Sequence, residues 1–196
     1  DCLQSLREWA GEVIVVDTGS TDNTVAIAES LGARVFSFPW TDSFSEARNE
    51  SLRYATGEWV LWVDADDTVP VESATEILRV AKSAPPEIIA FVIPVQFVED
   101  GTSHGGTRVD HVKLIRNVQG IAFEGRIHEQ ILPSLRRLGG EIARCNALVL
   151  HSGYDTSTEG QAKKRQRDLH LLKRDLEERP DHPFVLFNLG MTHHYM

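Results

Sequence analysis

Carboxylates stand at two points of the sequence where short apolar runs end. Asp17 follows the run 12–16, and Asp64, Asp66 and Asp67 follow the run 58–63. Ligands of open α/β sheets bind beyond the carboxyl ends of the strands, so both positions are candidate sites. Asp64 and Asp66 are two residues apart and face one side of an extended segment, which suits a hard cation that bridges carboxylates to phosphates. The alternative is a solvated acidic turn in which Asp67 caps the next helix.

A candidate basic partner lies between these two acidic positions. Arg48 belongs to a helix predicted over 43–54, where an arginine can meet a base or a phosphate. Asp17 also opens the segment DTGSTDNT, which combines an acid with residues that leave the backbone accessible. The alternative for Arg48 is an ordinary cation on the surface of its helix.

The elements that must position these side chains alternate along the first part of the chain. Apolar runs predict strands at 12–16, 33–38 and 58–63, and capping and periodicity predict helices at 3–10, 25–31, 43–54 and 71–83. This alternation predicts a doubly wound α/β sheet.

The pattern changes after residue 87. Longer, partly alternating strands are predicted at 88–98, 109–116 and 143–151, with a glycine-rich loop at 99–106. From residue 156 the composition becomes helical and charged, with a narrow apolar stripe of Leu169, Leu172 and Leu176, and a further helix begins at Phe184.

Composition excludes several classes of function. The chain has 196 residues, 41% of them hydrophobic and 25% charged, which is ordinary for a globular protein. The formal charge of −9 argues against a nucleic-acid partner, because duplex-binding proteins carry a basic surface. Cys2 and Cys145 are too few for a disulfide framework, and no apolar run approaches the ~20 residues of a transmembrane helix. We therefore expect a soluble, cytoplasmic protein.

Three motifs together resemble the family-2 glycosyltransferases with the GT-A fold. They are IVVDTGSTDNT at 14–24, ARN at 47–49 and WVLWVDADD at 59–67, in the order and at the spacing typical of that family. Within it, GRIHE at 125–129 and LHSGY at 150–154 most resemble bacterial members with a tetratricopeptide extension, including relatives of peptide S-glycosyltransferases. The resemblance implies an inverting, metal-dependent transfer of a sugar from a nucleotide-diphosphate donor to an acceptor nucleophile.

The resemblance also implies roles for individual residues. Asp17 and Arg48 match positions near the nucleotide base, and Asp64 and Asp66 match the Asp-X-Asp motif. Asp64 then faces the ribose and the metal, and Asp66 binds the metal that bridges the diphosphate, either Mn²⁺ or Mg²⁺. Such a cation neutralises the charge of the leaving diphosphate.

Two later motifs complete the predicted site. His128-Glu129 falls where many members place the catalytic base, and we predict Glu129, because a carboxylate suits the deprotonation of an acceptor hydroxyl or thiol. The alternatives are that His128 is the base, or that Glu129 only pairs with Arg126 or Arg136 on the surface. His151 resembles a late histidine that completes the metal site in some GT-A enzymes, and its alternative is a hydrogen-bonded core histidine.

The resemblance sets the expected domains. Residues 1–155 form a GT-A domain whose first strand is missing, and residues 156–196 form a helical extension at the start of a tetratricopeptide-like repeat. The extension is a candidate surface for a protein partner, and the acceptor is a peptide, a glycan or a lipid-linked glycan. Two other functions stay open, namely a haloacid-dehalogenase-like phosphatase with Asp64 as nucleophile and a non-catalytic binding module on a repeat scaffold.

Overall fold

The computed structural model describes residues 1–98, 106–153 and 157–194 as a mixed α/β protein with helices at its C-terminal end. The helices are α1 (Cys2–Leu6), α2 (Thr24–Ser30), α3 (Phe44–Tyr54), α4 (Val71–Ser83), α5 (Leu132–Leu138), α6 (Thr158–Glu178) and α7 (Pro183–His194). The strands are β1 (Ile14–Asp17), β2 (Arg34–Ser37), β3 (Trp59–Leu61), β4 (Asp67–Thr68), β5 (Ile88–Phe97), β6 (Arg108–Arg116), β7 (Glu141–Arg144) and β8 (Val149–His151).

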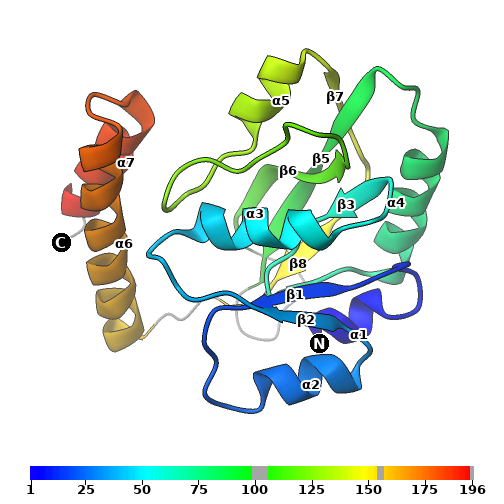
Figure 1. Cartoon of the computed structure of the whole chain (residues 1–196), viewed down its shortest axis with the longest axis horizontal. Coiled ribbons are helices and arrows are strands. Elements are labelled where there is room, and N and C mark those ends of the chain that lie inside the picture. Colours follow the sequence, from blue (N-terminus) through cyan, green and yellow to red (C-terminus); the bar gives the residue numbers. More distant parts are fainter. Residues whose placement is uncertain (99–105, 154–156, 195–196) are drawn as a thin grey trace.

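The first two strands form a small parallel sheet of their own. β1 and β2 pair with Ile14 opposite Arg34 and Asp17 opposite Ser37, and α2 connects them. In Figure 1 this pair lies below α3, with α1 and α2 beside it. Asp17 thus ends β1, as the sequence predicts.

The remaining strands form the second, six-stranded sheet in the order β3-β6-β5-β8-β4, with β7 also paired to β5. β5 and β6 make a long antiparallel pair, whereas β7 and β8 both run parallel to β5. β4 adds to β8 in antiparallel register, which places Asp67 opposite His151. The sheet is therefore mixed, and its short edge strand β4 carries part of the acidic motif.

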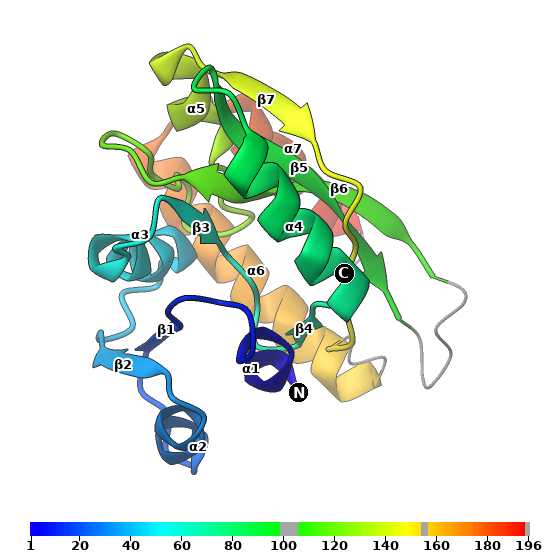
Figure 2. The same ribbon diagram turned by 90° about the vertical axis from the view of Figure 1, so that its right-hand side faces the viewer.

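Apolar side chains cover both faces of the larger sheet. On one face α4 buries Ala74, Ile77 and Val80, at helical spacing, in a cluster that includes Phe91 and Ile93 of β5. The opposite face has its own cluster, made by Ile89, Ala90, Ile115, Phe123, Ile131 and Leu135. Figure 2 shows α4 in front of the sheet and α6 behind it.

The C-terminal helices α6 and α7 pack on each other and on the sheet domain. Leu171 and Leu172 of α6, Val185 of α7 and Ile127 of the sheet domain are buried in one cluster. Phe44, at the start of α3, packs against the same cluster. Among the described residues, the structure contains no helix with both the length and the apolar character needed to cross a membrane.

Most predicted elements are present, with local differences. The helix predicted at 3–10 is shorter, ending at Leu6, and the strand predicted at 143–151 is broken into β7 and β8. Helix α5 was not expected, although Pro133 in its first turn and Gly139 in a left-handed conformation (φ 71°) after it are typical helix boundaries. Of the predicted loop 99–106, residues 99–105 lie outside the described residues.

Candidate functional site

Four potential metal ligands come together where β3 ends and β4 pairs with β8. Asp64, Asp66, Asp67 and His151 each place one ligand atom within 4.8 Å of the others. His151 Nδ1 lies 3.4 Å from an Asp66 oxygen and 3.0 Å from Asp67 Oδ1. The structure thus brings together the three predicted ligands Asp64, Asp66 and His151.

Asp67 is the buried member of this group. Its side chain is fully shielded from solvent, and its Oδ2 accepts hydrogen bonds from the Asp64 N–H at 2.9 Å and from Lys113 Nζ at 2.5 Å. The helix that follows begins after Pro70 without a side-chain cap, so the alternative in which Asp67 caps it is wrong. Asp67 instead ties the acidic loop to β6 and β8.

Lys113 is a buried cation that sequence reasoning missed. Its side chain is 2% exposed, its Nζ lies 4.0 Å from Asp64 Oδ2, and the same nitrogen stands 4.0 Å from the centre of the Trp62 ring. The available signal was a lysine inside the apolar stretch 112–115 of a predicted strand. Together with Arg48, Lys113 compensates the charge of the acidic cluster from the protein side.

Arg48 joins the acidic loop to the segment that carries Glu129. Its Nη2 donates to Asp64 Oδ1 at 2.7 Å, its Nε donates to Glu129 Oε1, and its guanidinium stacks 4.3 Å from the centre of the Trp62 ring. Burial opposes the charged guanidinium, but Asp64 and Glu129 outweigh it and raise the pKa of Arg48. The alternative of a surface cation is wrong, because the side chain is only 20% exposed.

The same contacts hold Asp64 in its charged form. Burial alone would raise the pKa of Asp64, but the nearby charges of Arg48 and Lys113 and the hydrogen bond from Arg48 lower it. Asp64 is therefore a carboxylate with one oxygen on Arg48 and the other facing Lys113 at 4.0 Å.

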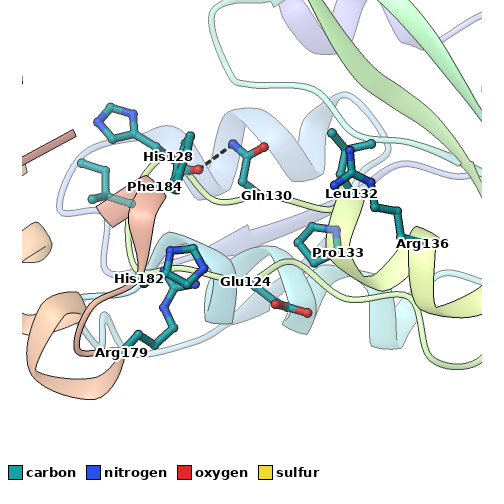
Figure 3. Close-up of a pocket in the computed structure, with 10 residues that line it drawn as sticks. Glu124, His128, Gln130, Leu132, Pro133, Arg136, Arg179, His182 and Phe184 are labelled. Carbon is teal, nitrogen blue, oxygen red and sulfur yellow. Dashed lines mark hydrogen bonds between the residues drawn. The ribbon is translucent and has the colours of Figure 1, made fainter. Parts of the chain in front are cut away.

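Glu129 faces this site, whereas its neighbour His128 faces another cavity. The Glu129 side chain is 11% exposed and pairs with Arg48, and Arg126 pairs instead with Glu178, so the alternative of a surface pair with Arg126 or Arg136 is wrong. His128 lines a cavity of about 300 Å³ between the segment 124–136 and the α6–α7 junction (Figure 3). The backbone directs the two neighbouring side chains to different places.

Asp17 lies outside the metal-ligand group found among the described residues. At the end of β1, its carboxylate accepts hydrogen bonds from the N–H groups of Gly19 and Ser20 at 3.1–3.2 Å. Hydrogen bonds from Ser20 and Gly19 lower the pKa of Asp17. Asp17 thus stabilises the turn after β1 and keeps a charged carboxylate near the surface.

A groove of about 660 Å³ borders the acidic group on the side of α6. Asp66, His151 and Gly153 line it together with Lys163, Lys164 and Arg167 of α6. Gly153 allows the close approach of Asp66, because a Cβ at this position would stand 1.7 Å from Asp66 Oδ2. The lining of the groove therefore combines candidate cation ligands with basic side chains of α6.

Residues 1–155 match the model of a family described as Glycosyl transferase family 2. This chain belongs to glycosyltransferase family 2. Membership confirms the predicted family and speaks against the haloacid-dehalogenase alternative, which needed Asp64 as a covalent nucleophile. The acidic group, Arg48 and Glu129 all lie within the matched residues.

Two curated relatives of this family-2 glycosyltransferase cover nearly the whole chain. This chain is 32% identical over 196 residues to the "TPR repeat-containing protein Synpcc7942_0270" of Synechococcus elongatus, and the match covers 96% of the chain and 47% of that protein. It is 30% identical over 197 residues to the SPbeta prophage-derived glycosyltransferase SunS of Bacillus subtilis, covering 100% of the chain and 46% of SunS. The chain thus spans about half the length of the curated relatives it matches.

Solved structures confirm the GT-A fold. S. aureus TarS 1–349, crystallised in complex with UDP-GlcNAc, superposes with a TM-score of 0.57 at 17% identity over 97% of this chain and 66% of TarS 1–349. The mannosyltransferase PcManGT from Pyrobaculum calidifontis, in complex with GDP-Man and Mn²⁺, gives 0.54 at 16% identity over 94% of this chain and 60% of its own. At these identities the likeness concerns the fold.

Proposed function

We propose that this glycosyltransferase transfers a sugar from a nucleotide-diphosphate donor with the help of a divalent cation. The observation that carries the proposal is the convergence of Asp64, Asp66, Asp67 and His151 within 4.8 Å, next to Arg48 and Glu129. Asp67 is fully buried and bound to Lys113, whereas Asp64, Asp66 and His151 are partly exposed and would hold the cation. Carboxylate oxygens with one imidazole suit Mn²⁺ better than Mg²⁺.

The protein's own residues would bind and orient the donor around that cation. Once bound, the cation would neutralise charge on the departing diphosphate. Asp17 would contact the nucleotide base from the end of β1. Arg48 binds both Asp64 and Glu129, and this fixes the position of the proposed metal ligand Asp64 relative to Glu129. The complexes of TarS with UDP-GlcNAc and of PcManGT with GDP-Man and Mn²⁺ support this class of donor and cofactor.

Glu129 is the proposed catalytic base. It would accept the proton of the acceptor nucleophile as that nucleophile attacks the anomeric carbon and the diphosphate leaves from the opposite face. A single in-line displacement inverts the anomeric configuration. The orientation of the Glu129 carboxylate toward Arg48, while His128 lines the other cavity, favours Glu129 over His128 as the base.

The acceptor is proposed to be a peptide, a glycan or a lipid-linked glycan. The helical extension 156–196, whose α7 exposes Leu186, Phe187 and Met191, would serve as the start of a repeat and as a surface for a protein partner. We also propose a cytoplasmic location, because Cys2 and Cys145 are free and buried, as suits a reducing compartment.

Titration calorimetry tests the proposal without knowledge of the acceptor. UDP, GDP and dTDP are titrated into the protein, each with and without Mn²⁺, and one of them is expected to bind in a Mn²⁺-dependent manner. Binding that does not change with the cation would refute the role of the metal. A failure of all three to bind would favour the non-catalytic module instead.

A further inference from the structure

The helical extension reaches the loop that carries the proposed base. Asp175 of α6 is 1% exposed, and its Oδ2 accepts a hydrogen bond from the backbone N–H of Arg126 at 3.0 Å. Arg179, one turn later, donates to both oxygens of Asp175 at 2.7 Å. This bidentate pair, in which Asp175 is buried and Arg179 partly exposed, holds the backbone three residues before Glu129, from outside the family-2 match.

Arg126 is fixed from the other side as well. Its carbonyl accepts a hydrogen bond from the N–H of Phe44 at 2.8 Å, and its Nη1 donates to the carbonyls of Thr41 and Asp42 at 3.1 and 2.9 Å. The chain around the start of α3 and helix α6 thus both hydrogen-bond to Arg126 and hold its backbone between them.

The loop that joins Arg126 to Glu129 is also tightly constrained. Gly125 has a φ of +99°, and a Cβ there would stand 3.0 Å from Arg179 Nη2, so the backbone lies directly against the pair. Ile127 is 6% exposed and packs with Leu171 and Leu172 of α6. His128 has a φ of 53°, a conformation rarely adopted by residues other than glycine, which turns the chain just before Glu129.

We propose that Asp175 and Arg179 are positioning residues for Glu129. The pair fixes the loop 125–129 so that the Glu129 carboxylate contacts Arg48. Helix α6 thereby contributes to the geometry of the active site. The inference rests on the proposed function, in which Glu129 is the base. Because a misplacement of about 1 Å can lower a rate by ~100-fold, loosening this loop slows the chemistry without removing a group that touches substrate.

The test compares variants by the release of nucleoside diphosphate from UDP-GlcNAc and GDP-mannose in Mn²⁺, with water as the acceptor. Asp175→Ala removes both hydrogen-bonding oxygens, and Asp175→Asn keeps one oxygen for the Arg126 N–H. Glu76→Gln is the matched control, because Glu76 accepts a bidentate pair of hydrogen bonds from Arg79 on α4, outside the metal-ligand group and the groove that borders it.

We expect kcat to fall by about 10- to 100-fold in Asp175→Ala and less in Asp175→Asn, with KM for the donor unchanged. Glu76→Gln should match the wild type. Deuterium exchange in a peptide spanning 124–130 should be faster in Asp175→Ala than in the control, since the Arg126 N–H loses its acceptor. Unchanged exchange and kcat in both Asp175 variants would overturn the inference.

A double variant separates positioning from general damage. If Asp175 acts through Glu129, then adding Asp175→Ala to Glu129→Gln costs no further activity, because the group being positioned has already lost its function. If the losses in kcat of the two single variants multiply in the double variant, the inference is overturned, while the role of Glu129 as base is unaffected. Wild-type kcat in Glu129→Gln alone, or no release by the unmodified protein, would instead refute the proposed function.

Discussion

Replacing Lys113 with methionine should destabilise the protein strongly. Methionine keeps the length and much of the apolar stem against Trp62, but it removes the cation 2.5 Å from Asp67 Oδ2. Asp67 then keeps its contacts with the Asp64 N–H and His151 while its fully buried charge loses the main compensating partner. Breaking a buried ion pair from one side costs about 3–5 kcal/mol in the free energy of unfolding.

Urea unfolding followed by circular dichroism, with EDTA present to exclude metal binding, measures this loss. For a chain of this size the expected cost corresponds to a fall in Tm of roughly 6–20 °C. Lys163→Met is the control, because Lys163 pairs with Glu159 at the surface, and its free energy of unfolding should change by less than about 1 kcal/mol.

A second substitution isolates the uncompensated charge. Asp67→Asn in the Lys113→Met background replaces the stranded carboxylate by a neutral amide of the same shape, and it should restore part of the lost free energy of unfolding. A loss below about 1 kcal/mol in Lys113→Met, or a further loss in the double variant, would refute the view that Lys113 mainly compensates Asp67.

Three further predictions concern the metal site, a helix cap and pH. Gly153→Ala should weaken Mn²⁺ binding by about tenfold in calorimetry, because the added Cβ must displace the Asp66 carboxylate, whereas Gly11→Ala, with open space around it, should leave the affinity unchanged. Ser43→Ala should lower the free energy of unfolding in urea by about 1 kcal/mol, since it removes the acceptor of the Glu46 N–H at the start of α3; no loss would contradict this cap. Hydrogen bonds from Thr56, first of all its N–H, lower the pKa of Glu12 below its ordinary 4.5. The wild type should therefore be more stable than Glu12→Gln above that pH, and this difference should disappear as the pH falls through the lowered pKa. A constant urea-midpoint difference between wild type and Glu12→Gln from about pH 6 to about pH 3 would contradict the role of Glu12.

Local patterns were sufficient for much of the fold. The Ser43 cap predicted the start of α3, and the helix predicted at 71–83 coincides with α4, because each depends on residues within one or two turns. The pairing of β3 with β6 and of β4 with β8 depends on contacts across more than fifty and eighty residues, so no local periodicity encodes it.

The candidate site divides in the same way. Asp64 and Asp66 were predicted to lie together from their spacing at a strand end, and His151 was added from the family resemblance; the three side chains do lie together. The pairing of Arg48 with Glu129, and the buried Lys113 beside Asp67, were not predicted, since a charge in the sequence does not name its partner.

The most direct test of metal-dependent sugar transfer is the rate of nucleoside-diphosphate release from the preferred nucleotide sugar in Asp66→Ala. Its control is Asp110→Asn, because Asp110 is 45% exposed against 41% for Asp66 but pairs with Arg144 outside the metal-ligand group of the described residues. We predict that Asp66→Ala loses nearly all Mn²⁺-dependent release while Asp110→Asn keeps the wild-type rate. An unchanged rate in Asp66→Ala would contradict the account.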